Sequence, residues 1–142
     1  MEAKEYMQQL GRIKVKIKNY EDRLETLKET ATSIRIPYDS ERVQTSRNGS
    51  KIENSVLRIV DMEKKLQDAI MELIRNQEEI LSTIEELPHM EYDFLYNRYF
   101  KEMSYKEIAF KNQKTLSWST YIHNKAITHL QEMLDERESM AG

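Results

Sequence analysis

Apolar residues recur at alternating steps of three and four over residues 3–34 and again over residues 52–87, and no other feature constrains the fold as strongly. In the first segment these positions are Ala3, Tyr6, Leu10, Ile13, Ile17, Tyr20, Leu24, Leu27, Ala31 and Ile34. A seam of this kind is typical of a helix that packs against another helix, because its apolar stripe is narrow. We therefore expect residues 1–87 to form a long antiparallel helical hairpin, coiled-coil-like, which can dimerise into a four-helix bundle.

The second seam is wider than the first and contains polar positions. It runs through Ile52, Val56, Ile59, Glu63, Leu66, Ile70, Leu73, Gln77, Ile80, Ile84 and Leu87. The polar Glu63 and Gln77 can fix the register or the number of partner helices. Three further residues widen the stripe, namely Val60, Ile74 and Leu81. This width predicts that the second helix contacts more than one neighbour.

Residues 35–49 interrupt the periodicity and predict a connecting loop. Pro37 disfavours helix for the residue before it, and Asn48-Gly49 is a turn signal. Ser50, with Glu53 three residues later, then predicts the cap of the second long helix. We interpret the loop as a linker, although three arginines leave a nucleic-acid contact open: Arg35, Arg42 and Arg47.

Residues 88–135 read as three shorter helices that form a helix-turn-helix domain, with residues 136–142 as an acidic tail. Pro88 ends the long helix and begins a segment, residues 89–101, with an apolar surface. Ser104 predicts a helix cap, with Glu107 completing a capping box. Ala109 supplies the small side chain that a close helix crossing requires.

The polar stretch 111–116 predicts the turn, and Ser117 predicts the cap of the last helix. That helix carries an inward stripe of Ile122, Ala126, Leu130 and Met133. The candidates for contact with DNA base edges are Ser117, Trp118, Thr120, Tyr121 and Asn124. Two alternatives remain: the two helices form a plain helical hairpin, or Trp118 belongs to the core.

Positive charge is concentrated on this domain, although the chain has a net charge of −3. Residues 96–131 contain six basic and two acidic residues, whereas residues 50–90 contain five basic and nine acidic ones. This asymmetry is what attraction to phosphate predicts. The candidates for phosphate contact are Arg98, Lys111, Lys114 and Lys125. The alternative is a solvated helical face, which also applies to the basic residues between positions 12 and 18.

Several classes of protein are disfavoured. The chain has no cysteine, which excludes disulfides and thiolate metal sites, and it has no apolar run long enough to cross a membrane. The N-terminus lacks the apolar core of a signal peptide, so we expect a cytoplasmic protein. His123 and His129 lie six residues apart and do not form a metal pair, and neither a phosphate loop nor a nucleophile motif is present. We expect no enzyme activity and no cofactor or metal.

The chain resembles ArpU-type late transcriptional regulators, found in phages and integrated elements of Gram-positive bacteria. Their C-terminal part is similar to region 4 of primary sigma factors. The stretches LETLKETATSI, PYDSERVQTS and KIENSVLRIVDMEKKL are similar to the hairpin of that group, and LYNRYFKEMSYKEIA and YIHNKAITHL to its sigma-like end. The most specific parts are the Arg98-Tyr99 pair, residues 105–109, and the spacing of His123 from Lys125-Ala126.

The resemblance implies a regulator that binds promoter DNA in the host bacterium and contacts the host RNA polymerase. It places base contacts at Leu116, Ser117, Thr120 and Tyr121, with Trp118 adjacent. Sigma factors have charged residues at several of these places, where this chain has Leu116 and Tyr121. Two other functions stay open: a protein-interaction module that does not bind specific DNA, and a packaging or structural component of a phage.

Overall fold

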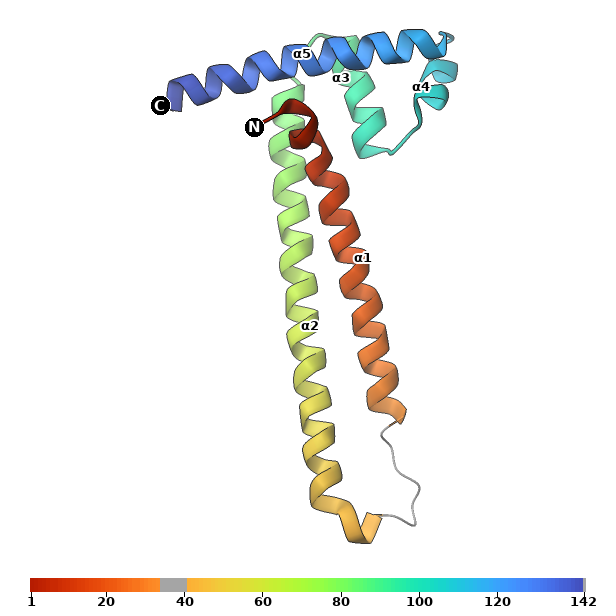
Figure 1. Ribbon diagram of the computed structural model, residues 1–142, viewed down its shortest axis with the longest axis vertical. Helices are drawn as coiled ribbons and strands as arrows, with labels where there is room; N and C mark the ends of the chain where they lie inside the picture. The colour runs from red at the N-terminus through yellow and green to blue at the C-terminus, as the bar shows by residue number, and fades with distance from the viewer. Residues whose placement is uncertain (34–40, 142) are drawn as a thin grey trace. The chain divides into compact units, whose positions relative to one another are not determined.

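The computed structural model describes the backbone of residues 1–33 and 41–141, and every element in these ranges is a helix. In chain order these are α1 (Ala3–Ser33), α2 (Glu41–Ile84), α3 (His89–Leu95), η2 (Tyr96–Phe100), α4 (Tyr105–Lys111) and α5 (Leu116–Ala141) (Figure 1). The prediction of an all-α fold is confirmed. Within these ranges, none of the helices combines the length and the apolar character that a membrane crossing demands.

The chain divides into two compact units. The first, which we call the terminal unit, contains Met1–Arg12 and Leu73–Gly142, and the second, the hairpin unit, contains Ile13–Glu72. The sequence predicted a boundary at residue 87 instead. The difference arises because the first turns of α1 and the last turns of α2 supply side chains to the core formed by α3, α4 and α5.

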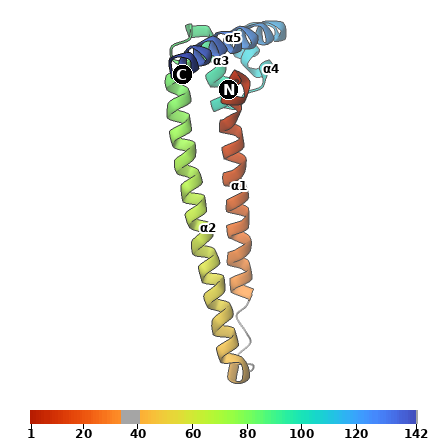
Figure 2. The ribbon, with the colours of Figure 1, turned by 60° about the vertical axis from the view of Figure 1, so that its left-hand side comes forward.

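In the hairpin unit, α1 and α2 run side by side in opposite directions (Figure 1 and Figure 2). Lys16 lies 3.7 Å from Glu72, and Lys28, further along α1, lies 4.0 Å from Glu63, which precedes Glu72 on α2. The predicted seam of α1 is confirmed here, since each of its members is buried or half-buried: Ile13, Ile17, Tyr20, Leu24, Leu27 and Ala31.

The predicted seam of α2 is only partly correct. Ile59 and Leu66 are half-buried as expected, but Val56 and Ile70 are 50% and 40% exposed. The residues one position earlier are covered instead: Ser55 is half-buried in place of Val56, and Met62 and Ala69 are buried in place of Glu63 and Ile70. The wide stripe of α2 contains two overlapping faces, and a single partner helix can bury only one of them.

The loop predicted for residues 35–49 is wrong over its second half, because α2 begins at Glu41. Asn48-Gly49 and Ser50 therefore lie inside a helix of 44 residues, and Ser50 does not cap it. Once a helix is formed, each added residue gains a backbone hydrogen bond, so a long helix can absorb the roughly 1 kcal/mol penalty of a glycine. Ile34, Pro37 and the remainder of the predicted loop lie outside the described residues.

The terminal unit has one apolar core that draws on all of its helices. Its fully buried members include Met7, Leu10, Ile80, Ile84, Phe94, Leu95, Ile108 and Leu130. Residues 136–141 of the predicted acidic tail are instead the last part of α5, which continues to Ala141, and Gly142 lies outside the described residues. Arg137 holds this end of α5 against α2, because its guanidinium donates to Thr83 Oγ1 at 2.8 Å and lies 3.5 Å from the Glu86 carboxylate.

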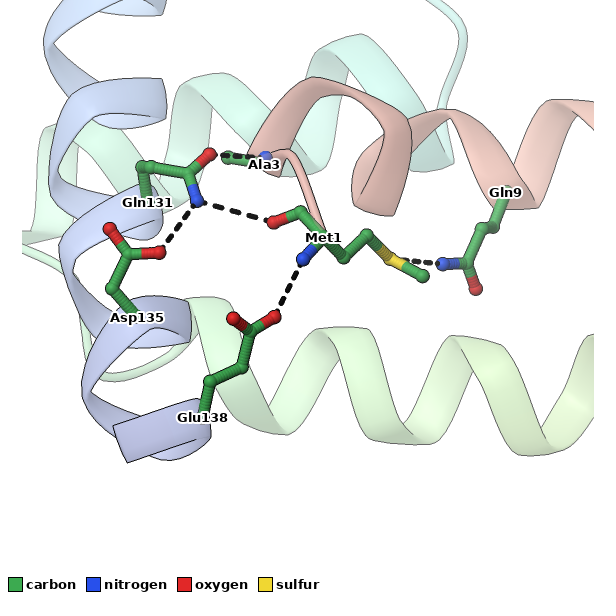
Figure 3. A network of polar contacts seen from close by, with 6 residues as sticks. All are labelled: Met1, Ala3, Gln9, Gln131, Asp135 and Glu138. Atoms are coloured by element: carbon green, nitrogen blue, oxygen red, sulfur yellow. Dashed lines mark hydrogen bonds and ion pairs between the residues drawn. The ribbon is translucent and has the colours of Figure 1, made fainter. Parts of the chain in front are cut away.

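The start of α1 is bound to α5 by polar contacts in which Gln131 is central (Figure 3). Its side-chain oxygen accepts a hydrogen bond from the Ala3 amide at 2.7 Å, and its side-chain nitrogen donates to the Met1 carbonyl at 3.2 Å and to Asp135 at 3.1 Å. The Met1 ammonium lies 2.6 Å from the Glu138 carboxylate. These contacts join two segments that are far apart in the sequence.

Candidate nucleic-acid interface

The first helix of the candidate interface is α3, and Pro88 is its N-cap. The helix predicted for residues 89–101 does not stay α-helical, because residues 96–100 form the π-helical turn η2. The wider turn is closed by a hydrogen bond from the Lys101 amide to the Tyr96 carbonyl, at 3.2 Å. Asn97 is buried in this turn and donates to Asp93 Oδ2 at 3.2 Å.

The capping box predicted for α4 is confirmed. The Ser104 hydroxyl accepts a hydrogen bond from the Glu107 amide at 3.1 Å, and the Glu107 carboxylate accepts one from the Ser104 amide at 3.3 Å. Ala109 is buried, as the close crossing of two helices requires. Near the start of α5, the Ser119 hydroxyl donates to the Tyr105 carbonyl at 2.8 Å and so ties the two helices together.

A tight turn connects α4 to α5. Asn112 ends α4, and its side-chain nitrogen donates to the Ile108 carbonyl at 2.8 Å. Gln113 adopts a left-handed backbone with a φ of 57°, which reverses the chain direction. The Lys114 amide then donates back to the Ala109 carbonyl at 2.8 Å. Both hydrogen bonds therefore tie the turn to the last residues of α4.

The cap of α5 is Thr115, so the prediction of Ser117 as the cap is wrong. The Thr115 hydroxyl accepts a hydrogen bond from the Trp118 amide at 3.2 Å, three residues on. Because α5 begins at Leu116, Ser117 lies in its first turn with an exposed side chain. The hydroxyl of Ser117 thus belongs to the outer face of the helix.

The two faces of α5 differ sharply in burial. Its buried residues are Ser119, Ile122, His123, Ala126, Leu130 and Leu134. Its exposed residues in the first three turns are Leu116, Ser117, Thr120, Tyr121, Asn124 and Lys125. Four of the five base-edge candidates therefore lie together on the outer face. The fifth candidate, Trp118, is half-buried and so lies only partly on that face.

Trp118 is half-buried and packs against Phe94, with the ring centroids 6.2 Å apart and the rings edge to face. Phe94 itself is only 1% exposed and also contacts Tyr105 at 5.6 Å and His123 at 5.9 Å. The aromatic rings of α3, α4 and α5 thus meet around Phe94. This packing favours the core alternative for Trp118 over a base contact.

His123 sits in the same aromatic cluster and is held in its neutral form. Burial lowers the pKa of His123 below its usual value, and its Nε2 lies 2.8 Å from the Tyr99 hydroxyl. Burial also raises the pKa of Tyr99 to about 12. The pair therefore forms a neutral hydrogen bond, in which Tyr99 donates to Nε2 when the imidazole proton is on Nδ1.

The four phosphate candidates fall into two groups. Arg98 donates to the Met103 carbonyl at 3.1 Å and stacks over the Tyr105 ring at 4.8 Å, so its guanidinium holds the fold together. Lys111 donates to Asn97 Oδ1 at 3.4 Å. Lys114 and Lys125 are exposed, and the Lys125 ammonium lies 5.7 Å from the centre of the Tyr121 ring. We therefore expect Lys114 and Lys125 to be the residues available to phosphate.

Three exposed residues of α4 were not among the candidates for DNA contact, namely Lys106, Glu107 and Phe110. Phe110 is 85% exposed, which is unusual for an aromatic residue. The helical period could have identified it, because Phe110 follows the buried Ile108 by two residues and so points to the opposite side. Leu116, at the start of α5, is also exposed, at 57%.

Comparison with protein-family models, curated proteins and solved structures found no match to this chain. Within residues 1–33 and 41–141, no group of three or more His, Asp or Glu side chains is arranged to hold a metal ion.

Proposed function

We propose that α4 and α5 bind double-stranded DNA, with the outer face of α5 in the major groove, and that the protein regulates transcription of phage or mobile-element genes. The observation that carries the proposal is the division of α5 into a buried face and a polar outer face. Ser117, Thr120 and Asn124 present the hydroxyl and amide groups that read base edges. A helix of α5's diameter fits the major groove.

Three further features support DNA as the partner. Lys114 and Lys125 flank the polar face with positive charge, and phosphate contacts supply most of the affinity in such complexes. Thr115 caps the first turn of α5, and Ser119 ties that turn to α4, so the outer face is held in place before binding. The resemblance to the sigma-like end of ArpU-type regulators points to the same helix.

Selection of binding sites from random double-stranded DNA by the full-length chain tests the proposal. We expect one enriched sequence motif, whose affinity is then measured by fluorescence anisotropy at several salt concentrations. Asn124→Ala should weaken discrimination at one base position by about 1–3 kcal/mol. Lys125→Ala should weaken binding to all sequences and reduce the salt slope by about 0.9.

Lys65→Ala provides the matched control, since Lys65 is an exposed lysine of α2 in the hairpin unit. It should leave the affinity and the salt slope unchanged. The proposal fails if no motif is enriched and the chain does not shift DNA even at low salt. It also fails in its phosphate assignment if Lys125→Ala behaves as Lys65→Ala does.

A second candidate function, binding of a protein partner such as host RNA polymerase, is supported by the exposed apolar residues beside the same helices. Phe110 and Leu116 expose most of their side chains, and aromatic anchors dominate protein interfaces. Pull-down of purified bacterial RNA polymerase by the wild-type chain and by Phe110→Asp separates the two candidates. Polymerase binding that is lost in Phe110→Asp, with no DNA shift by the wild type, would favour the second function.

A further inference from the structure

The side of α2 that α1 leaves uncovered carries a second apolar stripe within the hairpin unit. Val56, Val60 and Ile70 are 50%, 55% and 40% exposed. With Glu63 and Gln67 between them, they recur at steps of four, three, four and three, so all five residues lie on one face of the helix. Soluble proteins rarely leave such a row of aliphatic side chains in water unless it binds something.

A groove of about 730 Å³ lies next to this stripe in the same unit. Leu24 of α1 and Leu66 of α2 line it, together with acidic residues of α1. Lys28 also lines the groove and pairs with Glu63, which stands in the middle of the stripe. The groove and the stripe therefore form one continuous surface, which we call the open face.

The charges along the edge of the open face change sign from one end to the other. Lys14, Lys18, Glu21, Glu25 and Glu29 recur at steps of four, three, four and four, and the last three line the groove. If α1 lies against its counterpart, a parallel copy of the hairpin would place lysine against lysine and glutamate against glutamate. An antiparallel copy would instead place Lys18 opposite Glu25. It would also bring Gln67 of α2 close to its own counterpart, because the pairs Lys16–Glu72 and Lys28–Glu63 set the middle of this part of α1 beside residues 67–68.

We propose that a second copy of this chain packs on the open face in an antiparallel, two-fold symmetric arrangement, which completes a four-helix bundle. The half-buried leucines of the groove and the stripe of α2 would then form the core of the bundle. The change of charge sign along α1 favours this partner and this direction, because the antiparallel copy places opposite charges together. The pairing does not depend on DNA binding.

Sedimentation of the full-length chain tests the proposal. The wild type should sediment at twice its mass of 17.0 kDa, whereas the double variant Val60→Glu, Ile70→Glu should sediment as a monomer with unchanged helical circular dichroism. Both substituted side chains are exposed in the single chain, so the fold of the monomer should persist. Lys65→Glu, on another exposed side of α2, should remain dimeric. A monomeric wild type, or a dimeric double variant, would overturn the proposal.

The direction of pairing is tested by charge reversal. Lys18→Glu and Glu25→Lys should each weaken the dimer roughly three- to tenfold, because each change turns two attractive pairs into repulsive ones. Combining the two changes should restore the wild-type dissociation constant. If the combined variant is no stronger than the single ones, the antiparallel register is wrong.

Cross-linking gives an independent test, because the chain has no cysteine. With a short bis-maleimide, Gln67→Cys should cross-link to its own copy, since Gln67 lies near the two-fold axis. Val56→Cys should not, because the two copies of residue 56 would be roughly 30 Å apart in the antiparallel arrangement. Cross-linking of both variants would indicate a parallel dimer and refute the proposal.

Discussion

Replacing Phe94 by alanine should destabilise the terminal unit by about 3–5 kcal/mol. The ring is 1% exposed and packs edge to face with Trp118, Tyr105 and His123. Loss of a buried phenylalanine removes about 1.5–3 kcal/mol of apolar transfer free energy, and the cavity left behind adds the rest. The lost ring contacts act in the same direction, at about 0.5–1.5 kcal/mol for each pair.

Phe110→Ala is the matched control, because it removes the same side chain from a site that is 85% exposed. It should change the free energy of unfolding by less than about 0.5 kcal/mol. Urea unfolding followed by tryptophan fluorescence measures both variants, since Trp118 is the single tryptophan of the chain and lies beside Phe94. If Phe94→Ala costs less than about 1 kcal/mol, the aromatic cluster does not organise the unit as described.

Three further predictions concern α5 and its neighbours. Burial in the folded state lowers the pKa of His123, so below pH 6.5 the unfolded chain binds more protons than the folded one. The free energy of unfolding should therefore fall as the pH drops below about 6.5 and level off once the pH is below the pKa of the folded state. His123→Gln should flatten this profile in urea titrations at several pH values. Glu91 is buried, and its carboxylate lies 2.5 Å from His129 Nδ1. His129→Ala should therefore lower the free energy of unfolding by about 1–3 kcal/mol, because it leaves the carboxylate without this partner. Thermal unfolding measures the loss, and a loss near zero would mean that water replaces the imidazole. Thr115→Ala should lower the free energy of unfolding by about 1 kcal/mol, and Ser117→Ala by less than about 0.5 kcal/mol. A larger loss for Ser117→Ala than for Thr115→Ala would show that Ser117 is the cap of α5.

The all-helical fold and the seam of α1 were predictable from the sequence, because a narrow stripe with regular spacing allows only one face to be buried. The face that α2 turns toward α1 was not predictable. Met62 and Ile70 lie on different sides of one wide stripe, and only the partner decides which of them is covered. The width of the stripe predicts more than one neighbour, but spacing alone does not show which face each neighbour covers.

The ends of the helices were predicted with mixed success. Ser104 was recognised because Glu107 makes the capping box reciprocal, whereas Thr115 was missed because Ser117, two residues later, has the same chemistry. Asn48-Gly49 has the composition of a turn, yet the surrounding residues keep it helical. Local composition therefore shows which structures a segment can adopt, and the neighbouring residues determine which of them it adopts.

Among the candidate contact residues, spacing correctly separated the outer face of α5 from the inner one. Spacing could not show that Arg98 stacks on Tyr105 or that Trp118 packs against Phe94, because each contact joins two different helices. A basic or aromatic residue near a recognition helix has the same appearance in a sequence whether it is held inward or free.

The division of α5 has a consequence for engineering and for evolution. Ser117, Tyr121 and Asn124 are exposed, whereas the residues that hold the helix in place, including Ser119 and Ile122, are buried on the other side. Substitutions at the three outer positions should therefore be nearly neutral for folding. Under the proposed function, a combinatorial library confined to them would diversify the DNA sequence that is bound without loss of folded protein, and natural variants would acquire new targets by the same route.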